Sequence, residues 1–593
     1  KGSLYWVLDK TITAMGSRLL RRWINQPLLD ITEINNRQAA VTELVDNYTI
    51  NLKLRDLLKK VYDLERIVSK LNTGNALPAD MLSLKNSLRV IPEIKNVLAG
   101  FQGMLSEVEL GMDKHEKIVN LIEDAINPEA TYSMKSGAII KSGYSPEIDE
   151  LRQISSDSKK WLLNLELKEK EKTGIKTLKI GFNKIFGYYF EVTKANIDLV
   201  PSYFQRKQTL ANAERYVIDE LKEFEEKILG AEERLSRLEQ ELFGQIKRTI
   251  IEHNSKIQQT AAAIAQMDVI TNLAFIAVHN KYCKPVINSS NRIKIDGARH
   301  PVIERLQDNF VANNIDINNE HHMIHIITGP NMAGKSTFAR TVALITLLAQ
   351  IGSYIPADSG EIGVVDKIFA RVGANDDLST GQSTFMVEMN EVAYILKNAT
   401  SRSLIILDEV GRGTSTYDGL SIAWSITVYL HDIIKAKTIF TTHYHELTVL
   451  ENLLDKVKNY HVLVNEVEDN ITFLHKIAAG STNKSYGIHV AELAGLPKHL
   501  LSNAKQILKN LEKPDMGAAE LIAVTSELEQ YCLSEDTTVN HENLVPTPYN
   551  KLFQDICNDL KSIDINSMSP IKALNYLAAL KEKLSTVEDD DCE

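Results

Sequence analysis

A glycine-flanked loop that ends in a lysine and a serine is the stretch best suited to bind phosphate. Residues 329–336 read GPNMAGKS, which fits G-x-x-x-x-G-K-[ST], and they follow the apolar run 323–327. A strand, this loop and a helix would direct backbone N–H groups and a helix N-terminus at phosphate oxygens. We expect Lys335 to reach the β- and γ-phosphates and Ser336 to bind Mg²⁺. An incidental glycine turn is the alternative for so short a string.

Three further side chains with suitable chemistry follow two more apolar runs. Asp408 and Glu409 come directly after residues 404–407, and His443 comes directly after 438–442. A parallel strand beside the first would place Asp408 at the same sheet edge as a second Mg²⁺ anchor. Glu409 would orient or deprotonate the attacking water, and His443 would contact that water or the γ-phosphate. The H-x-H-E spacing beginning at His443 does not match a zinc-binding H-E-x-x-H helix.

Three longer strings around these residues resemble the MutS family of DNA mismatch repair ATPases. They span residues 329–337, 376–389 and 408–419. The resemblance implies an ABC-type ATPase that uses ATP and Mg²⁺. The phosphate-contacting residues of the family correspond here to Gly329, Pro330, Asn331, Met332, Ala333, Gly334, Lys335, Ser336 and Thr337.

The same resemblance implies two further groups of nucleotide contacts. Ser383 and Thr384 would contact the nucleotide of a partner subunit, which makes the ATPase composite and the protein a homodimer. Phe310 and His461 would sandwich the adenine. From their chemistry alone, these two rings are only suited to stacking and would otherwise be assigned to the core.

Length and composition set limits on the rest. The chain has 593 residues, of which 44% are hydrophobic and 24% charged, so we expect several globular domains. The net charge of −11 argues against a uniformly basic surface, and any DNA contact must be local. Four dispersed cysteines indicate a reducing compartment, and we expect a cytoplasmic, nucleoid-associated bacterial protein without structural zinc. We expect no membrane-spanning segment, and Lys1 suggests a fragment or processed product.

The expected fold is multidomain, α + α/β. Helical periodicity and the family resemblance predict a helical core with lever arms, a β-rich clamp inserted between the levers, an ABC-type ATPase domain, and a small helical C-terminal element. The predicted boundaries are 1–157 for the helical core and first lever arm, 158–218 for the clamp, 219–282 for the second lever helices, 283–515 for the ATPase, and 516–593 for a linker and dimerisation helix.

The second lever is predicted to be long. Allowing for breaks at Gly230 and Gly244, helical spacing across it gives an element about 100 Å in length. A lever that transmits strain and a coiled-coil spacer have the same pattern, and the resemblance favours the lever.

The clamp is the most plausible DNA contact. Residues 174–212 have six basic and two acidic residues, hence a local charge of +4, interleaved with aromatic side chains. This composition suits sequence-independent contact with the DNA backbone, although a solvated basic hairpin is an equal alternative. The candidate contacts are Lys184, Lys194, Arg206 and Lys207.

We expect the family's mismatch-reading and connector domains to be absent from this chain. The only Phe-x-Glu begins at Phe224 inside a charged helical stretch, so we expect Phe224 to pack rather than to wedge into DNA. The expected function is that of a mismatch repair ATPase, which binds mismatched or looped duplex DNA as a dimeric clamp and works with a MutL-type protein. A paralogue acting on recombination or branched DNA and an SMC-like structural ATPase are the alternatives.

Two helical segments near the end have competing interpretations. Residues 485–508 read as helix, turn and helix, and we favour clasping a dimer partner over reading DNA because the second helix is apolar. Residues 569–581 resemble a C-terminal element that joins dimers into tetramers, and packing on their own chain is equally plausible.

Overall fold

The structure is a computed structural model. It describes residues 2–130, 139–183, 187–307, 309–330, 333–373, 383–467, 470–481 and 487–497, with Leu500, Leu501, Ala504 and Leu508 beyond them. The chain divides into two units, Lys1–Leu501 and Ser502–Glu593, and every element below belongs to the first. The predicted linker at 516–593 and the helix at 569–581 lie outside the described residues.

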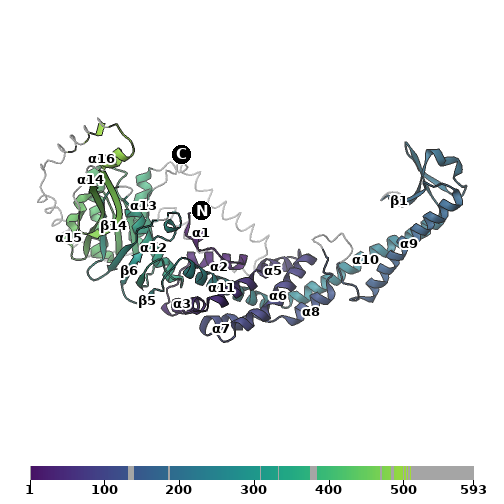
Figure 1. The fold of residues 1–593 in the computed structure, drawn as a ribbon, viewed down its shortest axis with the longest axis horizontal. Coiled ribbons are helices and arrows are strands. Elements are labelled where there is room, and N and C mark those ends of the chain that lie inside the picture. The colour runs from purple at the N-terminus through teal and green to yellow at the C-terminus, as the bar shows by residue number, and fades with distance from the viewer. Residues whose placement is uncertain are drawn as a thin grey trace, which may run out of the picture. The chain divides into compact units, whose positions relative to one another are not determined.

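The first part of the chain is helical, as its periodicity predicts (Figure 1). Its helices pack around one apolar cluster that includes Leu20, Leu44 and Leu58. They are α1 (Leu4–Leu8), α2 (Ala14–Asn25), α3 (Ile31–Asp46), α4 (Tyr48–Leu58), α5 (Leu64–Asn72), α6 (Pro78–Leu98), α7 (Gly103–Leu110) and α8 (Glu116–Ala125).

The start of α2 is tied to α11 (Asn254–His279) by a buried carboxylate. Thr13 caps α2, because its side chain accepts a hydrogen bond from the Gly16 N–H. The Asp268 carboxylate on α11 accepts from the backbone N–H of Ile12 and from both the N–H and the hydroxyl of Thr13, at 2.7–3.0 Å. A Cβ at Gly16 would lie 2.3 Å from this carboxylate, so the helices approach closely only because the residue is glycine.

A small antiparallel sheet is inserted between α9 (Pro146–Thr173) and α10 (Asp219–Ile251). Its strands, in the order β1-β2-β4-β3, are β1 (Lys179–Asn183), β2 (Gly187–Thr193), β3 (Gln205–Thr209) and β4 (Ala213–Val217). The predicted domain boundary at 158 falls inside α9, and the first strand begins at Lys179. A 3₁₀ segment, η2 (Lys194–Leu199), follows β2.

The two helices that lead to the sheet pack against each other. The rings of Trp161 on α9 and Phe224 on α10 stack with their centroids 3.5 Å apart. Phe224 is therefore a packing residue, as its helical context predicts.

The prediction of one rod of about 100 Å is wrong. Gly230 and Gly244 lie inside α10 and do not break it, whereas the chain leaves the helix at residues 252–253. At 1.5 Å per residue, the 33 residues of α10 span about 50 Å.

The remainder of the predicted second lever, α11, is the central helix of the helical region. It contacts α2, α3, α4, α5 and α7. It is also apolar and long enough to cross a membrane by composition, which we did not expect from the sequence, but 78% of that window is buried by neighbouring helices. Burial by protein accounts for its apolar composition.

Two sheets make up the α/β region. A four-stranded sheet has the order β5-β9-β6-β7 and a six-stranded sheet has the order β10-β11-β12-β8-β13-β14. The strands are β5 (Val286–Asn288), β6 (Arg292–Ala298), β7 (Asn313–Asn318), β8 (Ile324–Thr328), β9 (Ser359–Gly363), β10 (Ile368–Arg371), β11 (Leu404–Asp408), β12 (Lys437–Thr441), β13 (Val457–Val467) and β14 (Asn470–Ala479). The fold thus combines helices with mixed sheets, as expected.

The helices and short helical segments of this region connect the strands. They are η3 (Ile303–Arg305), α12 (Lys335–Gln350), α13 (Thr384–Asn398), α14 (Thr416–Tyr429), the π-helical turn η4 (Leu430–Ile434), η5 (His445–Val449), α15 (Leu450–Leu453) and α16 (Gly487–Leu493). The first helix of the predicted dimer clasp corresponds to α16, whereas most of residues 498–508 lie outside the described residues.

Helix α12 joins the α/β region to the helical region. Gln350, at its last position, is buried, and its side chain donates to the carbonyls of Leu28 and Val365 at 2.9 Å each. The same amide accepts from the Val365 N–H at 3.0 Å, and the Leu28 N–H donates to the Gln350 carbonyl at 3.0 Å. The helix that follows the glycine loop therefore ends against the turn after α2.

Candidate nucleotide-binding site

Three parallel strands bring the sequence motifs to one edge of the six-stranded sheet. Thr441 at the end of β12 pairs with Asp408 of β11 on one side and with Ile327 of β8 on the other. The sequence predicted that β11 lies beside β8, and this is wrong because β12 lies between them. Since all three strands run in the same direction, their carboxyl ends still meet at one edge, the position where open α/β sheets bind ligands.

The glycine loop between β8 and α12 has backbone conformations that suit glycine. Gly329 has φ 137° and Gly334 has φ 103°, and a Cβ at Gly329 would lie 3.3 Å from Val462. Helix α12 begins at Lys335, and its N-cap residue, Gly334, makes no side-chain cap hydrogen bond. Its first N–H groups are thus available to a phosphate. Asn331 and Met332 lie outside the described residues.

Lys335 is buried and points back at the loop. Its ammonium donates to the carbonyls of Gly329 at 2.5 Å and Pro330 at 3.0 Å, and it lies 3.8 Å from a Glu409 carboxylate oxygen. Burial lowers its pKa to about 8, against the opposing effect of the Glu409 and Asp408 charges. An incoming phosphate would offer this buried cation a stronger acceptor than a carbonyl.

Ser336 and Asp408 form a small oxygen-rich cluster. The Ser336 hydroxyl donates to Asp408 Oδ1 at 2.8 Å, and the Thr441 hydroxyl donates to the same oxygen. Arg340 lies 3.8 Å from the other carboxylate oxygen. A hydroxyl and one carboxylate fit Mg²⁺, which prefers oxygen ligands and takes most of the remainder from water and phosphate. Within the described ranges no group of three or more His, Cys, Asp or Glu side chains could hold a metal by itself.

Glu409 lies in a strained turn beside Lys335, Arg412 and His443. Its φ of 56° is unusual for a residue with a side chain. Its carboxylate pairs with His443 and Arg412. Burial opposes ionisation, but the hydrogen bond from His443 and the surrounding positive charges outweigh it and hold the pKa of Glu409 below its usual range. The carboxylate is thus kept ionised and oriented, as a water-positioning group requires.

A cavity of about 200 Å³ adjoins the glycine loop. Phe310, Gly334, Thr337 and His475 are among its lining residues. The sequence had paired Phe310 with His461, but His461 is not among the lining residues. Its Cα instead pairs with Thr328 and its Nδ1 lies 3.1 Å from the Gly480 carbonyl.

His475 is the residue that the sequence analysis missed. It lies on β14 with φ 51°, and its Nδ1 is 3.0 Å from the Ala333 carbonyl in the glycine loop. No motif surrounds it, and it is far from the loop in the sequence. The cavity favours His475 over His461 as the imidazole that meets a base stacked near Phe310.

The two residues predicted to act across a dimer lie at the start of α13. Ser383 is the N-cap residue and Thr384 the first helical residue, and both are exposed. The loop that precedes them, residues 374–382, lies outside the described residues. Their exposure is compatible with contact to a second chain.

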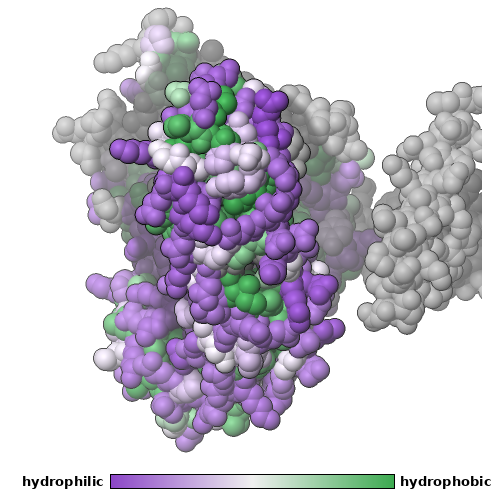
Figure 2. Space-filling view, turned by 90° about the vertical axis from the view of Figure 1, so that its right-hand side faces the viewer, coloured by the Kyte–Doolittle hydropathy of each residue, from purple (hydrophilic) through white to green (hydrophobic). Residues whose placement is uncertain are grey.

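The predicted DNA contacts lie on or beside the small sheet. Lys194, Arg206 and Lys207 are exposed, whereas Lys184 lies outside the described residues. Arg206 lies 3.6 Å from a carboxylate oxygen of Glu214, which is buried. Figure 2 views the molecule from the end at which the inserted sheet lies, and the surface that faces the viewer is mainly hydrophilic, with smaller hydrophobic areas.

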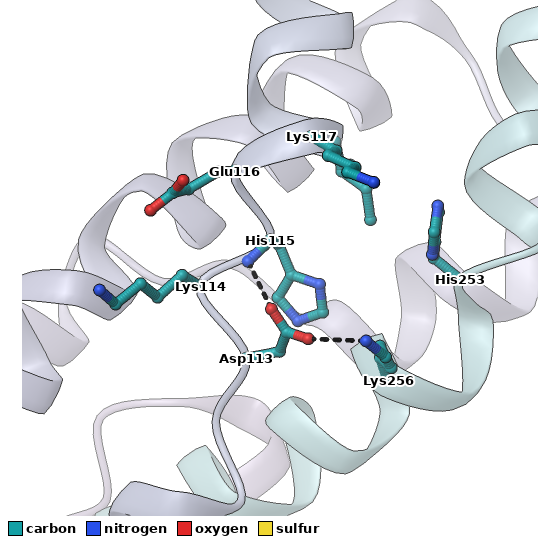
Figure 3. Close-up of a pocket in the computed structure, with 8 residues that line it drawn as sticks. Asp113, Lys114, His115, Glu116, Lys117, His253 and Lys256 are labelled. Atoms are coloured by element: carbon teal, nitrogen blue, oxygen red, sulfur yellow. Dashed lines mark hydrogen bonds and ion pairs between the residues drawn. The ribbon is translucent and has the colours of Figure 1, made fainter.

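A second cavity, of about 380 Å³, lies between the start of α8 and the junction of α10 with α11 (Figure 3). Asp113 accepts from the His115 N–H at 2.9 Å and pairs with Lys256 at 3.2 Å. The His115 ring lies 2.8 Å from the Thr260 hydroxyl. These groups satisfy one another and none belongs to a phosphate-binding motif, so we do not assign the nucleotide to this cavity.

Comparisons with known proteins agree with the motifs. A family model described as MutS domain III matches residues 1–274, and one described as MutS domain V matches residues 325–512. The protein named DNA mismatch repair protein MutS in Caldanaerobacter subterraneus subsp. tengcongensis is 51% identical over 589 residues, which is 99% of this chain and 66% of the relative. The protein of the same name in Caldicellulosiruptor bescii is 50% identical over 589 residues, covering 98% of this chain and 67% of the relative.

The chain belongs to the MutS family. It spans about two thirds of the length of these MutS relatives. The MutS domain III match runs from α1 into α11 and includes the inserted sheet, and the MutS domain V match includes β8, β11 and β12. The resemblance predicted from short motifs is therefore confirmed along nearly the whole chain.

Proposed function

We propose that this chain is the ATP-hydrolysing and DNA-clasping part of a DNA mismatch repair protein. It converts ATP and water to ADP and phosphate, and it uses this cycle to switch a dimer between gripping and sliding on mismatched or looped duplex DNA. The observation that supports this most strongly is the convergence of Lys335, Ser336, Asp408, Glu409 and His443 at the ends of three parallel strands.

Each of these side chains has a distinct role in hydrolysis. Lys335 leaves the loop carbonyls and pairs with the β- and γ-phosphates, while the N–H groups at the start of α12 donate to phosphate oxygens. Ser336 and Asp408 hold Mg²⁺, which neutralises phosphate charge. Glu409 accepts a hydrogen bond from the attacking water and aligns it, and His443 fixes the carboxylate and contacts the γ-phosphate or the water.

The cavity beside the loop takes the base of the nucleotide. Phe310 contributes an aromatic ring to the lining of the cavity. Thr337, in the first turn of α12, lines the same cavity. His475 supplies the imidazole in place of His461. A base is recognised here mainly by stacking.

The ATPase acts as a homodimer with two composite sites. Exposed Ser383 and Thr384 reach the nucleotide of the partner, and the region around α16 clasps the second chain. The C-terminal helix joins dimers into tetramers, and a MutL-type protein acts downstream. We place this activity in the bacterial cytoplasm at the nucleoid.

DNA is clasped by the inserted sheet. Lys194, Arg206 and Lys207 contact phosphates without reading base sequence.

Helix α12 transmits movement from the nucleotide site to the helical region. Since α12 begins at Lys335 and ends with the Gln350 contacts to Leu28, a shift of the helix at its phosphate end reaches the helical region directly. The relatives are named as DNA mismatch repair proteins, which favours a function in mismatch repair over a function in recombination or in processing branched DNA.

Phosphate release from ATP by the purified chain, with and without Mg²⁺, tests this function. We expect turnover that requires Mg²⁺ and that falls at least about 100-fold in Asp408→Asn, because the variant loses the carboxylate that anchors the metal. Turnover that persists without a divalent ion, or in Asp408→Asn, would contradict the site.

A further inference from the structure

The turn that follows Glu409 is held from several sides. Glu409 has φ 56° and Gly411 has φ 98°, so the chain reverses direction immediately after the carboxylate that positions water. A strained conformation of this kind persists only where its surroundings hold it. The groups that bind the turn must therefore hold it in this conformation.

Both polar groups of Gly411 are bonded to side chains from other elements. The Gly411 N–H donates to Glu388 Oε1 on α13 at 2.9 Å, and the Gly411 carbonyl accepts from the Tyr444 hydroxyl at 2.9 Å. A Cβ at Gly419 would lie 2.3 Å from the same carbonyl oxygen, so α14 presses on the turn as well. Two side chains and one helix thus fix the backbone on both sides of Gly411, two residues from Glu409.

The turn also packs against the first part of α13. A Cβ at Gly413 would lie 2.9 Å from the Cβ of Phe385, one helical turn before Glu388. Glu388 and Phe385 together hold residues 411–413 along the helix that begins with Ser383 and Thr384. Any shift of α13 is therefore transmitted to the turn that contains Glu409.

Glu388 is an unusual residue to find in this position. It is only 5% exposed, and burying a carboxylate is costly unless it is paired and hydrogen-bonded. Arg371, also 5% exposed, lies 3.9 Å from Glu388 Oε2 but approaches Glu391 more closely, at 3.0 Å. The shortest contact of the Glu388 carboxylate is thus the Gly411 N–H rather than the arginine.

We propose that Glu388 is a positioning residue for hydrolysis: its carboxylate holds the Gly411 N–H and thereby aims the Glu409 carboxylate at the attacking water. Tyr444 performs the matching task at the Gly411 carbonyl. This role rests on the proposed ATPase function, and it makes the start of α13 part of the support of the site in its own chain.

Three single substitutions test the role. Glu388→Ala removes the acceptor, and we expect kcat for ATP to fall at least about tenfold while the Kd for ADP stays within about twofold. The polar contacts of Glu388 among the described residues are with Gly411 and Arg371 rather than with the glycine loop. Glu388→Gln keeps an oxygen that accepts from the Gly411 N–H, and we expect it to retain most of the turnover. Tyr444→Phe should lower kcat in the same selective way.

Glu391→Ala is the matched control. Glu391 lies on the same helix as Glu388 and pairs with Arg371 of β10. Among the described residues it forms no ion pair or hydrogen bond with the turn, so its removal should leave kcat unchanged. Equal losses in Glu388→Ala and Glu391→Ala would overturn the proposal, because they would trace the effect to Arg371 and the stability of α13.

A double-mutant cycle identifies the group through which Glu388 acts. If Glu388 works only by positioning Glu409, Glu388→Ala combined with Glu409→Ala should show the same residual turnover as Glu409→Ala alone. A further loss in the double variant would overturn the role. No turnover by the unsubstituted chain would refute the proposed function, whereas turnover that is unchanged in Glu388→Ala would refute only the inference.

Discussion

At the scale of single residues, Lys335 has the clearest electrostatic signature. Its ammonium is buried against loop carbonyls, and burial lowers its pKa to about 8. A bound phosphate would restore the charged form and raise this pKa. In the free protein the lysine must then take up a proton to bind ATP at any pH above about 8.

We therefore predict that ATP affinity falls as pH rises through about 8. The charged form is fully present below that pH, so affinity should be flat there and then drop by up to about tenfold per pH unit. Equilibrium titration with a non-hydrolysable ATP analogue between pH 7 and 9.5 measures this. Adenosine, which has no phosphates, serves as the control and should bind independently of pH; an analogue affinity equally flat across the range would contradict the role of Lys335.

Some residues of the site could be located from the sequence, and others could not. Asp408 and Glu409 lie where the sequence predicts, at the end of a buried strand, and Lys335 and Ser336 lie at the start of the helix that follows the glycine loop. Short motifs fix these positions relative to the neighbouring strand or helix. His475 could not be found this way. It reaches the loop only because β14 continues the sheet beyond β13, and no local pattern encodes that position.

At the scale of elements, α12 connects two regions through one buried amide. Gln350 makes hydrogen bonds to Leu28 and Val365, and its loss would leave buried carbonyls unpaired. Such a loss costs about 1–3 kcal/mol. The helix would keep its phosphate end and the backbone bond from the Leu28 N–H, but it would lose the side-chain bonds that fix it to the turn after α2.

We predict that Gln350→Ala keeps basal ATP turnover within about twofold but abolishes most of any change in turnover caused by mismatched DNA. Thr346→Val is the matched control, because Thr346 is buried on the same helix but its hydroxyl donates only to Val342 of α12. ATPase assays with and without a mismatched duplex report the difference. An unaltered DNA response in Gln350→Ala would argue against transmission through α12.

The basic side chains on and beside the inserted sheet are expected to contact DNA phosphates. Replacing Lys194 or Arg206 by Ala should weaken duplex binding for matched and mismatched DNA alike, and each should reduce the log–log salt slope by about 1 if it contacts one phosphate. Lys59→Ala, at an exposed lysine directly after α4, should change neither quantity. Fluorescence anisotropy across a salt series is the measurement, and unchanged slopes would remove these residues from the DNA contact.

Elements were harder to predict than motifs, for identifiable physical reasons. Gly230 and Gly244 suggested breaks, yet packing of α10 outweighs the cost of about 1 kcal/mol per glycine in a helix interior. Periodicity joined α10 to α11 because both are helical, although α11 is buried by its neighbours. The order of β8, β12 and β11 was also missed, since chain order does not reveal which strand is inserted between two others.

At the scale of the whole molecule, the proposed composite ATPase requires two chains. Ser383 and Thr384 are exposed at the start of α13. If they serve the partner's nucleotide, Ser383→Ala and Lys335→Ala damage different halves of one composite site.

Mixing the two variants should therefore restore part of the activity. A mixed dimer contains one site with both an intact loop and an intact partner Ser383, so we expect about a quarter of the wild-type turnover at equal mixing. Each variant alone should be nearly inactive. A mixture no more active than its components would show that Ser383 acts within its own chain.

The most direct test of the central claim is to measure ATP binding and ATP turnover side by side in the unsubstituted chain, Lys335→Ala and Glu409→Ala. The account predicts that Lys335→Ala loses nucleotide binding, because the phosphates lose their buried cation, whereas Glu409→Ala binds ATP normally and loses turnover at least about 100-fold. Equal loss of binding in both variants, or turnover retained by Glu409→Ala, would contradict the assignment of these residues to one hydrolytic site.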